Sequence, residues 1–242
     1  MTTRLFLFSD IHANLPAMQA IEQAVADEAP DRVIFLGDMV DMGPHPAEVV
    51  DLIMAHADWE LLRGNHECYM NGDVRSRTGI DGEELSHQAW TRRQLRADQI
   101  QAIQTRCLWQ IDETIEGVPM RFQHYARMQP PDDDRFATNL RPKPHELEEI
   151  FQPGDRKLIA FGHLHYLHQG ETNGTTYLSV GPAGPSKTAN QTQYVIVEAG
   201  NGQCRIQQKT RAYDDRLFFK DMKKRKVASR QTILKIFYGG RG

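Results

Sequence analysis

Lys157-Leu158-Ile159-Ala160-Phe161 is a compact apolar run that leads directly into Gly162-His163-Leu164-His165. A short apolar run is typical of a buried strand, and open α/β sheets bind their ligands at the carboxyl ends of strands. In an extended stretch, residues two apart project to the same side, so we expect His163 and His165 to serve one metal ion or two neighbouring ones. The stretch therefore predicts a ligand-binding edge at the end of a central strand.

Two runs nearer the N-terminus end in similar side chains. Residues 4–9 lead into Asp10-Ile11-His12, and residues 32–36 lead into Gly37-Asp38. A helical pattern follows each of them. The order of strand, ligand and helix predicts βαβ units, a largely parallel sheet and an α/β fold.

Later apolar runs also end in polar residues. Residues 59–63 lead into Gly64-Asn65-His66-Glu67, and a hairpin with a turn at Gly117 leads into His124. Three further runs predict a meander of short strands that forms part of a second sheet: residues 175–180, 193–198 and 203–209.

Two additions are expected on a single domain of residues 1–242. Residues 71–106 predict an insertion, with a loop over the mouth of the site at 71–82 and a helical, cap-like stretch at 83–106. The buried side of that stretch is expected to carry Leu85, Trp90, Leu95, Ile100 and Ile103. For the basic tail, residues 214–242, a solvated helix with one packed face is favoured over contact with nucleic acid. Proline-rich residues 126–145 predict an irregular segment before a short helix at 144–151.

The composition argues against several classes of protein. The chain carries 29 basic and 32 acidic side chains, and its formal charge of -3 gives no general attraction to nucleic acid. We find neither a run of about 18 apolar residues nor a basic-then-apolar leader, so we expect no membrane span, no secretory signal and a cytoplasmic location. Three cysteines are too few for a disulfide framework or a four-thiolate zinc site. These patterns allow a homo-oligomer but do not indicate one.

The polar side chains at the strand ends form one candidate site. They are Asp10, His12, Asp38, Asn65, His66, His124, His163 and His165. Five of the ten histidines thus follow four strand-like runs. A lone histidine usually has a structural explanation, but that explanation does not account for so many at the same kind of position. Mixed imidazole and carboxylate ligands suit Mn, Fe, Zn or Ni, and the lack of thiolates argues against a structural zinc site.

The motifs Asp-x-His, Gly-Asp-x-x-Asp, Gly-Asn-His-Glu, a later lone His and Gly-His-x-His occur in that order between about residues 5 and 180. This series resembles the calcineurin-like metallophosphoesterase superfamily, and Gly43-Pro44 with the helical stretch 83–106 is similar to its small prokaryotic branch. The resemblance implies a sandwich of two mixed β-sheets with helices outside. It also implies a centre of two divalent transition metal ions at the strand ends, with Mn favoured.

The resemblance further implies a role for each residue of the site. Metal one would take Asp10, His12, Asp38 and His165. Metal two would take Asp38, Asn65, His124 and His163, so that Asp38 bridges the ions. A metal-activated hydroxide would attack phosphorus, and His66 would donate a proton to the leaving oxygen. Asp41 would hydrogen-bond His66, although a carboxylate that stabilises a turn or caps a helix explains it equally well.

Two more residues are candidates for binding the substrate phosphate. Arg63 precedes the Gly-Asn-His-Glu motif as in the protein phosphatases, although a surface ion pair also explains it. Asn14 lies near metal one, although capping of the following helix explains it as well. Met42 replaces an arginine of the protein phosphatases, and Tyr125-Ala126 follows His124 where the small branch commonly has glycine. We treat the other histidines as structural or surface groups: His45, His56, His87, His145 and His168.

The expected activity is hydrolysis of phosphodiester or phosphomonoester bonds in small, nucleotide-like molecules. Two alternatives from other classes stay open. One is a nuclease of the same superfamily, which the acidic balance disfavours. The other is a non-catalytic metal-binding scaffold, which the presence of His66 and of every expected ligand disfavours.

Overall fold

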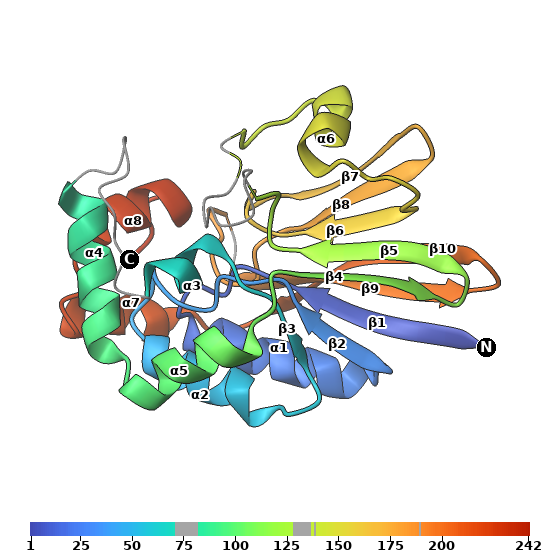
Figure 1. Ribbon diagram of the computed structural model, residues 1–242. Coiled ribbons are helices and arrows are strands. Elements are labelled where there is room, and N and C mark those ends of the chain that lie inside the picture. The colour runs from blue at the N-terminus through green and yellow to red at the C-terminus, as the bar shows by residue number, and fades with distance from the viewer. Residues whose placement is uncertain (71–81, 128–136, 138, 189) are drawn as a thin grey trace.

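Two five-stranded sheets lie face to face in the computed structural model, which describes residues 1–70, 82–127, 137, 139–188 and 190–242 (Figure 1). The strands of the first sheet are β1 (Thr2–Phe8), β2 (Arg32–Phe35), β3 (Glu60–Leu61), β9 (Gln191–Gly200) and β10 (Gln203–Ala212). Their order is β10-β9-β1-β2-β3. β1, β2 and β3 pair in parallel, whereas β9 pairs antiparallel with β1 and β10, which makes the sheet mixed.

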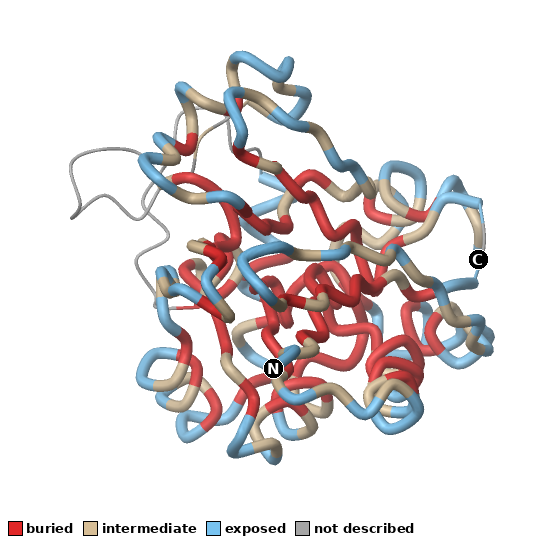
Figure 2. The backbone as a smooth tube through the Cα atoms, turned by 90° about the vertical axis from the view of Figure 1, so that its right-hand side faces the viewer, coloured by how far each residue is buried: buried red, intermediate tan, exposed pale blue. Residues whose placement is uncertain are grey.

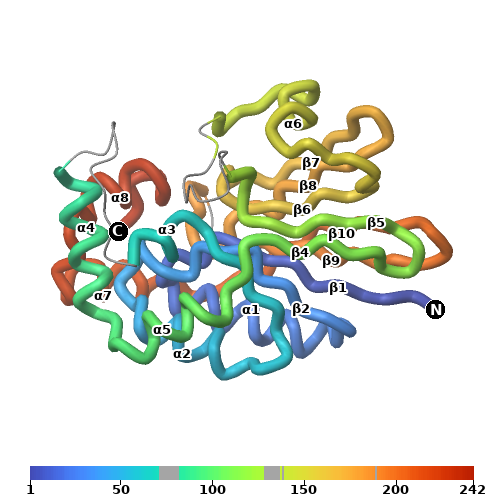
Figure 3. The backbone as a smooth tube through the Cα atoms, viewed as in Figure 1, coloured from blue at the N-terminus to red at the C-terminus, as the bar shows by residue number. Residues whose placement is uncertain are grey.

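The second sheet is also mixed. Its strands are β4 (Gln110–Ile115), β5 (Val118–Gln123), β6 (Leu158–Phe161), β7 (Leu167–Thr172) and β8 (Thr175–Val180), in the order β4-β5-β6-β8-β7. β5, β6 and β8 are parallel, and an antiparallel strand closes each edge. The parallel strands of both sheets end on the same side of the molecule, so their terminal side chains can meet there (Figure 3).

Helices cover the outer faces. The first sheet carries α1 (Leu15–Glu28), α2 (Pro46–Ala55) and α5 (Ala97–Arg106), and the second carries α6 (Pro144–Phe151). The remaining helices, which lie at the end where β1 and β2 finish, are α3 (Asn65–Tyr69), α4 (Gly82–Gln94), α7 (Arg216–Lys224) and α8 (Arg230–Phe237) (Figure 1). None of the helices in the described part of the chain is long and apolar enough to cross a membrane.

β1 shows why the N-terminal run is continuously apolar. Leu5 and Leu7 pack between the sheets, whereas Phe6 and Phe8 pack under α1 and α2. Successive side chains of a strand point to opposite faces, so a strand covered on both faces needs apolar residues at every position. All four side chains are fully buried, each contributing about 1.5–3 kcal/mol by leaving water. Figure 2 shows the resulting buried interior beneath an exposed outer layer.

The α/β fold with two mixed sheets and outer helices is confirmed, with corrections in detail. β9 and β10 belong to the first sheet, not to a meander in the second, because β9 pairs with β1 along six residue pairs. Hence the chain passes from the second sheet to the first after β8. The predicted third strand is reduced to the two residues of β3, and β7 was not predicted.

The helical stretch 83–106 also differs from the prediction. It is two helices, α4 and α5, separated at Leu95, and Leu85 is 37% exposed instead of buried. α5 packs with α2 on the first sheet, whereas Trp90 of α4 packs with the tail. Residues 71–81 of the predicted loop lie outside the described residues, so the cap-like role of the insertion stays a prediction.

The basic tail forms helices α7 and α8 with a packed side. Phe218, Met222, Ile233 and Tyr238 are buried in one apolar cluster with Trp90. The lysines of α7 face outward, and Lys220, Lys223 and Lys224 are exposed. The tail therefore covers the end of the sandwich where the parallel strands finish (Figure 1).

Candidate metal centre

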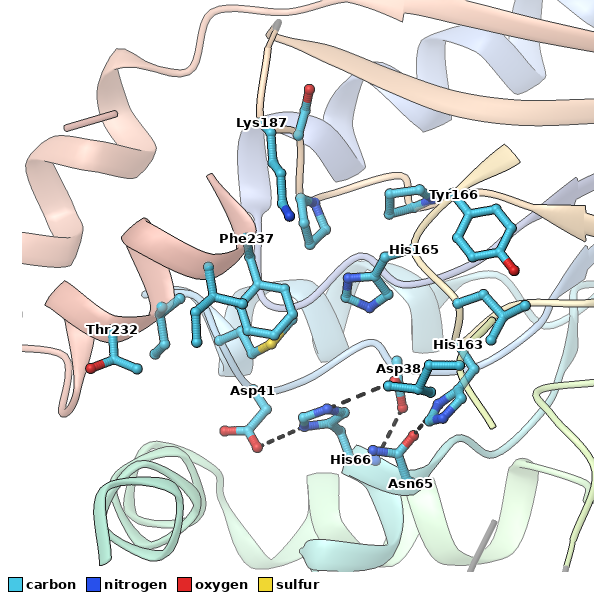
Figure 4. Close-up of a pocket in the computed structure, with 18 of the residues that line it drawn as sticks. Asp38, Asp41, Asn65, His66, His163, His165, Tyr166, Lys187, Thr232 and Phe237 are labelled. Carbon is cyan, nitrogen blue, oxygen red and sulfur yellow. Dashed lines mark hydrogen bonds and ion pairs between the residues drawn. The ribbon is translucent and has the colours of Figure 1, made fainter. Parts of the chain in front are cut away.

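The predicted ligands converge at the carboxyl ends of the parallel strands. Asp10 and His12 follow β1, Asp38 follows β2, His124 follows β5, and His163 and His165 follow β6, whereas Asn65 begins α3. The two sheets thus contribute to one site, and Figure 4 shows Asp38, Asn65, His163 and His165 around its floor. Three groups of these residues, each with ligand atoms within 4.8 Å of one another, can hold a cation: Asp10-His12-His165, Asp38-His124-His163 and His12-Asp38-His66.

The backbone is left-handed, not extended, at five of the ligands. His163 and His165 have φ values of 68° and 55°, so they do not project to one side of an extended stretch as the sequence suggested. Their chain bends instead, which sends His165 toward Asp10 and His163 toward Asn65. Asp10, His12 and Asp38 share positive φ values of 50° to 64°. Such conformations cost roughly 1–3 kcal/mol each and persist where the surroundings enforce them.

Glu67 supplies much of that enforcement. Its buried carboxylate accepts hydrogen bonds from the backbone nitrogens of Asp38 at 2.8 Å, Met39 at 2.8 Å and Gly64 at 2.7 Å. It thereby ties the turn after β2 to the turn after β3. Gly64 lies so close that a Cβ there would stand 2.0 Å from Asp38 Oδ1. The sequence contained this signal in Gly-Asn-His-Glu, but no role was predicted for the glutamate.

The first group joins Asp10, His12 and His165. His12 Nε2 lies 3.0 Å from His165 Nε2, and Asp10 Oδ1 lies 3.3 Å from the same nitrogen. His12 Nδ1 lies 3.3 Å from the carbonyl oxygen of Val40, to which it donates its hydrogen, so Nε2 of the neutral ring carries a lone pair. The lone pair of His12 Nε2 and the carboxylate oxygen of Asp10 therefore both face His165 Nε2, where a cation could be bound.

The second group joins Asp38, His124, His163 and Asn65. His124 Nδ1 donates to the Leu36 carbonyl oxygen at 2.8 Å, so Nε2 is the ring nitrogen that faces the group. That nitrogen lies 3.2 Å from Asp38 Oδ2, 3.1 Å from Asn65 Oδ1 and 3.2 Å from His163 Nδ1. Burial opposes protonation of His124, but the Asp38 carboxylate outweighs it and raises the pKa of the imidazole to about 9, so without a metal ion Nε2 holds a hydrogen among these acceptors. Divalent transition ions take this mixture of ligands, and one bound here would replace that proton.

Asp38 connects the two groups. Its Oδ2 lies 3.2 Å from His124 Nε2 and 3.8 Å from His12 Nε2, so one oxygen faces both. Burial alone would raise the pKa of Asp38, but the imidazoles of His124 and His66 hold it well below its ordinary value. The carboxylate is therefore ionised at neutral pH, as a metal ligand must be.

His66 stands beside these groups and pairs with Asp41. Its Nδ1 lies 2.8 Å from Asp41 Oδ2, and its backbone nitrogen donates to Asp38 Oδ1 at 3.0 Å (Figure 4). Burial opposes protonation of His66, but the carboxylates of Asp38 and Asp41 outweigh it and raise the pKa of the imidazole to about 10. The predicted hydrogen bond between Asp41 and His66 is thus present, and it favours a protonated ring.

Two residues around Asp41 were missed by the sequence reasoning. His87, treated as structural or surface by default, is 4% exposed, and its Nε2 lies 2.7 Å from Asp41 Oδ1. Thr91 donates its hydroxyl hydrogen to the same oxygen at 2.6 Å. The two stand four residues apart on α4, hence on one face of the helix, which was the available signal.

The two predicted phosphate ligands lie elsewhere. Asn14 caps α1 by accepting from Ala17 N at 3.1 Å, and its amide nitrogen donates to Gly184 O and to Tyr213 Oη. The guanidinium of Arg63 donates to the Gln104 carbonyl oxygen at 2.6 Å and lies over the Trp109 ring. Neither residue lines the pocket, and their contact with phosphate stays a prediction.

A pocket of about 910 Å³ opens above His66, Asn65 and the two histidines after β6. Its opposite wall comes from α4, from α8 and from the segment between β8 and β9. The Phe237 ring of α8 lies 5.4 Å from the His165 ring, and the Lys187 side chain extends toward the same space (Figure 4). The floor is therefore polar, whereas the wall combines aromatic and apolar surface with charged side chains of both signs, Lys187 between β8 and β9 and Glu83 and Glu84 on α4.

The comparisons with known proteins agree with this geometry. A family model described as the calcineurin-like phosphoesterase superfamily domain matches residues 3–202. An uncharacterized protein from Methanocaldococcus jannaschii is 25% identical over 173 residues, which cover 69% of this chain and 65%, just under two thirds, of that protein.

Solved structures share the whole fold. A metallophosphoesterase from Sphaerobacter thermophilus has a TM-score of 0.70 at 21% identity, with 100% of both chains covered. A hypothetical protein from Pyrococcus horikoshii has a TM-score of 0.79 at 15% identity, with 99% of both chains covered. The family match includes every predicted ligand and the resemblance is confirmed: the chain belongs to the calcineurin-like phosphoesterase superfamily.

Proposed function

We propose that the protein is a hydrolase with a dinuclear metal centre that cleaves phosphodiester or phosphomonoester bonds of small, nucleotide-like molecules. The observation that supports it most is Asp38 Oδ2, which faces His12 on one side and His124 on the other. A single carboxylate between two groups of lone pairs is the arrangement that two adjacent cations require.

Each cation has four protein ligands in this proposal. The first is held by Asp10, His12, Asp38 and His165, and the second by Asp38, Asn65, His124 and His163. When bound, the ions supply a water molecule of lowered pKa and hold the phosphoryl oxygens for in-line attack. Two divalent ions carry four positive charges against two carboxylates, so the site retains a surplus of positive charge that attracts an anionic phosphate. Manganese is the favoured ion.

His66 is the proton donor in the proposal. It stands at the border of the ligand groups, with its Nε2 3.9 Å from Asp38 Oδ2 and its Nδ1 occupied by Asp41. The Nε2 hydrogen is thus directed toward the space where the reacting phosphate would lie, and the carboxylate of Asp41 orients the ring. A group paired in this way is suited to deliver a proton to an alkoxide leaving group.

The pocket supports a small organic phosphoester as substrate. Its volume of about 910 Å³ lies within the range of small-molecule sites and far exceeds a phosphate group. Phe237 and Ile236 present apolar surface, and Lys187 extends toward the pocket (Figure 4). A phosphoester with a flat organic portion would complement the apolar part of this wall.

Metal analysis and hydrolysis of bis-p-nitrophenyl phosphate test the proposal together. Protein purified with Mn²⁺ should retain about two ions per chain and release p-nitrophenolate, and a chelator should abolish the release. A panel of phosphorylated metabolites would then rank substrates. Protein that holds no metal at saturating Mn²⁺, or that binds two ions and cleaves no phosphoester, would contradict it.

A further inference from the structure

His87 is a buried histidine with no role in the proposed chemistry. It contacts Asp41, the hydrogen-bond partner of the proposed acid His66, and the neighbouring Met42. His87 lies on α4, and its Nε2 is 2.6 Å from the backbone nitrogen of Met42 and 2.7 Å from Asp41 Oδ1. Its Nδ1 is 3.0 Å from the carbonyl oxygen of Ala228 in the tail. The ring therefore joins three segments that are distant in sequence.

The turn that His87 contacts is strained. Asp41 and Met42 have φ values of 71° and 57°, two successive left-handed residues without glycine. Such a turn is unfavourable by itself and needs contacts that hold it. Met42 N donates its hydrogen to His87 Nε2 at 2.6 Å, so the imidazole holds the backbone of the turn directly.

Asp41 in turn determines the orientation of His66. Its Oδ2 binds His66 Nδ1, while its Oδ1 is occupied by Thr91 and His87. The carboxylate is 1% exposed, so these side chains replace water around it. A shift of the turn would rotate the carboxylate and with it the imidazole.

The tail fixes the far side of His87. Besides the contact at Ala228, Ser229 donates its hydroxyl hydrogen to the Glu83 carbonyl oxygen at 2.8 Å, at the beginning of α4. Trp90, one turn further along α4, is buried among Phe218 and Tyr238 of the tail. The tail lies beyond the family match, which ends at residue 202.

We propose that His87 is a positioning residue: held by the tail, it fixes the Asp41–Met42 turn and so keeps the Asp41 carboxylate on His66. The inference rests on the proposed acid role of His66. It predicts that loss of His87 impairs protonation of the leaving group and spares metal binding.

A series of aryl phosphoesters, from p-nitrophenyl to phenyl, separates this role from general destabilisation. p-Nitrophenolate departs without a proton, whereas phenolate benefits from one. His87→Ala should lower kcat about 10-fold for the phenyl ester and less than about 2-fold for the p-nitrophenyl ester. His87→Gln, whose amide can reach the same turn, should recover most of the loss. If His87→Ala does not fold, His87→Phe fills the same volume without either hydrogen bond and replaces it.

A double-mutant cycle shows whether His87 acts through His66. In a His66→Ala background, His87→Ala should slow the phenyl ester by less than about 2-fold more, because residues that act through one another are non-additive. His56→Ala is the matched control, since His56 also pairs with a carboxylate, Glu22 at 3.0 Å, but does not line the pocket. Equal losses on all esters, full additivity or an effect of the control as large as that of His87→Ala would overturn the proposal.

An NMR measurement that does not depend on activity distinguishes failure of this inference from failure of the proposed function. In ¹⁵N-histidine-labelled protein loaded with diamagnetic Zn²⁺, the Nδ1 hydrogen of His66 should give a slowly exchanging NMR signal that His87→Ala broadens or removes and His56→Ala leaves in place. Wild-type protein that shows the signal but hydrolyses no ester would refute the proposed function alone. An unchanged signal in His87→Ala would refute the positioning role.

Discussion

On one side of the pocket, the polar side chains stand on turns that directly follow parallel strands, whereas helices α4 and α8 and the segment between β8 and β9 make the other side. We call these the ligand side and the helical side. The ligand side is held by short contacts between neighbouring turns, such as those of Glu67 with Asp38 and Gly64. The helical side is held by contacts between segments more than a hundred residues apart, such as His87 with Ala228.

This difference separates two tasks. The ligand side brings charges and lone pairs together and can bind cations whatever stands opposite. The helical side contributes the support of Asp41, the apolar surface of Phe237 and the Lys187 side chain. Changes on the ligand side should therefore abolish the chemistry, whereas changes on the helical side should alter proton delivery and substrate choice.

The largest effect is expected from Asp38→Ala. Its carboxylate faces both ligand groups, so we expect both cations to be lost and hydrolysis to fall by roughly 10⁴-fold or more. Mass spectrometric metal analysis and p-nitrophenolate release would measure the two effects. The matched change Asp112→Ala removes a carboxylate that pairs with Arg121 and Arg156 and should leave the metal content unchanged. Retention of both ions in Asp38→Ala would refute the bridging role.

His66→Ala should separate metal binding by the ligand side from catalysis. In the proposed mechanism its side chain serves proton transfer and not metal binding, so about two ions should remain while turnover of a poor leaving group falls roughly 10²–10⁴-fold. A variant that loses metal would instead make His66 a ligand, as its place in the group with His12 and Asp38 allows. Metal content and kcat measured on one preparation distinguish the two results.

Asp41→Asn tests the contact between the two sides, because Asp41 is contacted by His87 of α4 and raises the pKa of His66. The Asp41 carboxylate raises the pKa of His66, so its neutralisation lowers that pKa. Because an acid catalyst acts only when protonated, the basic limb of the kcat profile should move to lower pH, by about one to two units. Rates at low pH should change least. A basic limb that stays in place would show that a group other than His66 controls it.

Most of the ligand side could be predicted from sequence because each ligand follows its strand within a few residues. The apolar runs before Asp10, Asp38, His124 and His163 specify buried strands, and parallel strands end together. The bent backbone at His163 and His165 was not predicted, since an apolar pattern specifies where a strand ends but not the φ of the next residue. No role was predicted for Glu67, because its partners are backbone nitrogens, which no side-chain pattern in the sequence reveals.

The helical side was largely invisible to such reasoning. The apolar residues that lie among the basic residues of the tail predicted one packed face, but they did not predict its partner, which is Trp90 of α4. The contact of His87 with Ala228 spans 141 positions, and no local pattern encodes a pairing at that distance. β9 was assigned to the wrong sheet for the same reason, since its partner β1 lies at the other end of the chain.

The smallest effect is expected from Phe237→Ala on the helical side. Loss of the half-buried ring should raise KM for a nucleotide-sized substrate by about 10-fold, equivalent to about 1.4 kcal/mol of lost apolar contact, and leave kcat nearly unchanged. Leu217→Ala, an exposed apolar change in the same tail, should alter neither constant. Steady-state kinetics on a nucleotide and on a small alkyl phosphate would show the loss for the nucleotide alone. Equal loss for both would mean that the ring supports His165, 5.4 Å away, more than it binds substrate, and the two sides would then not be separable.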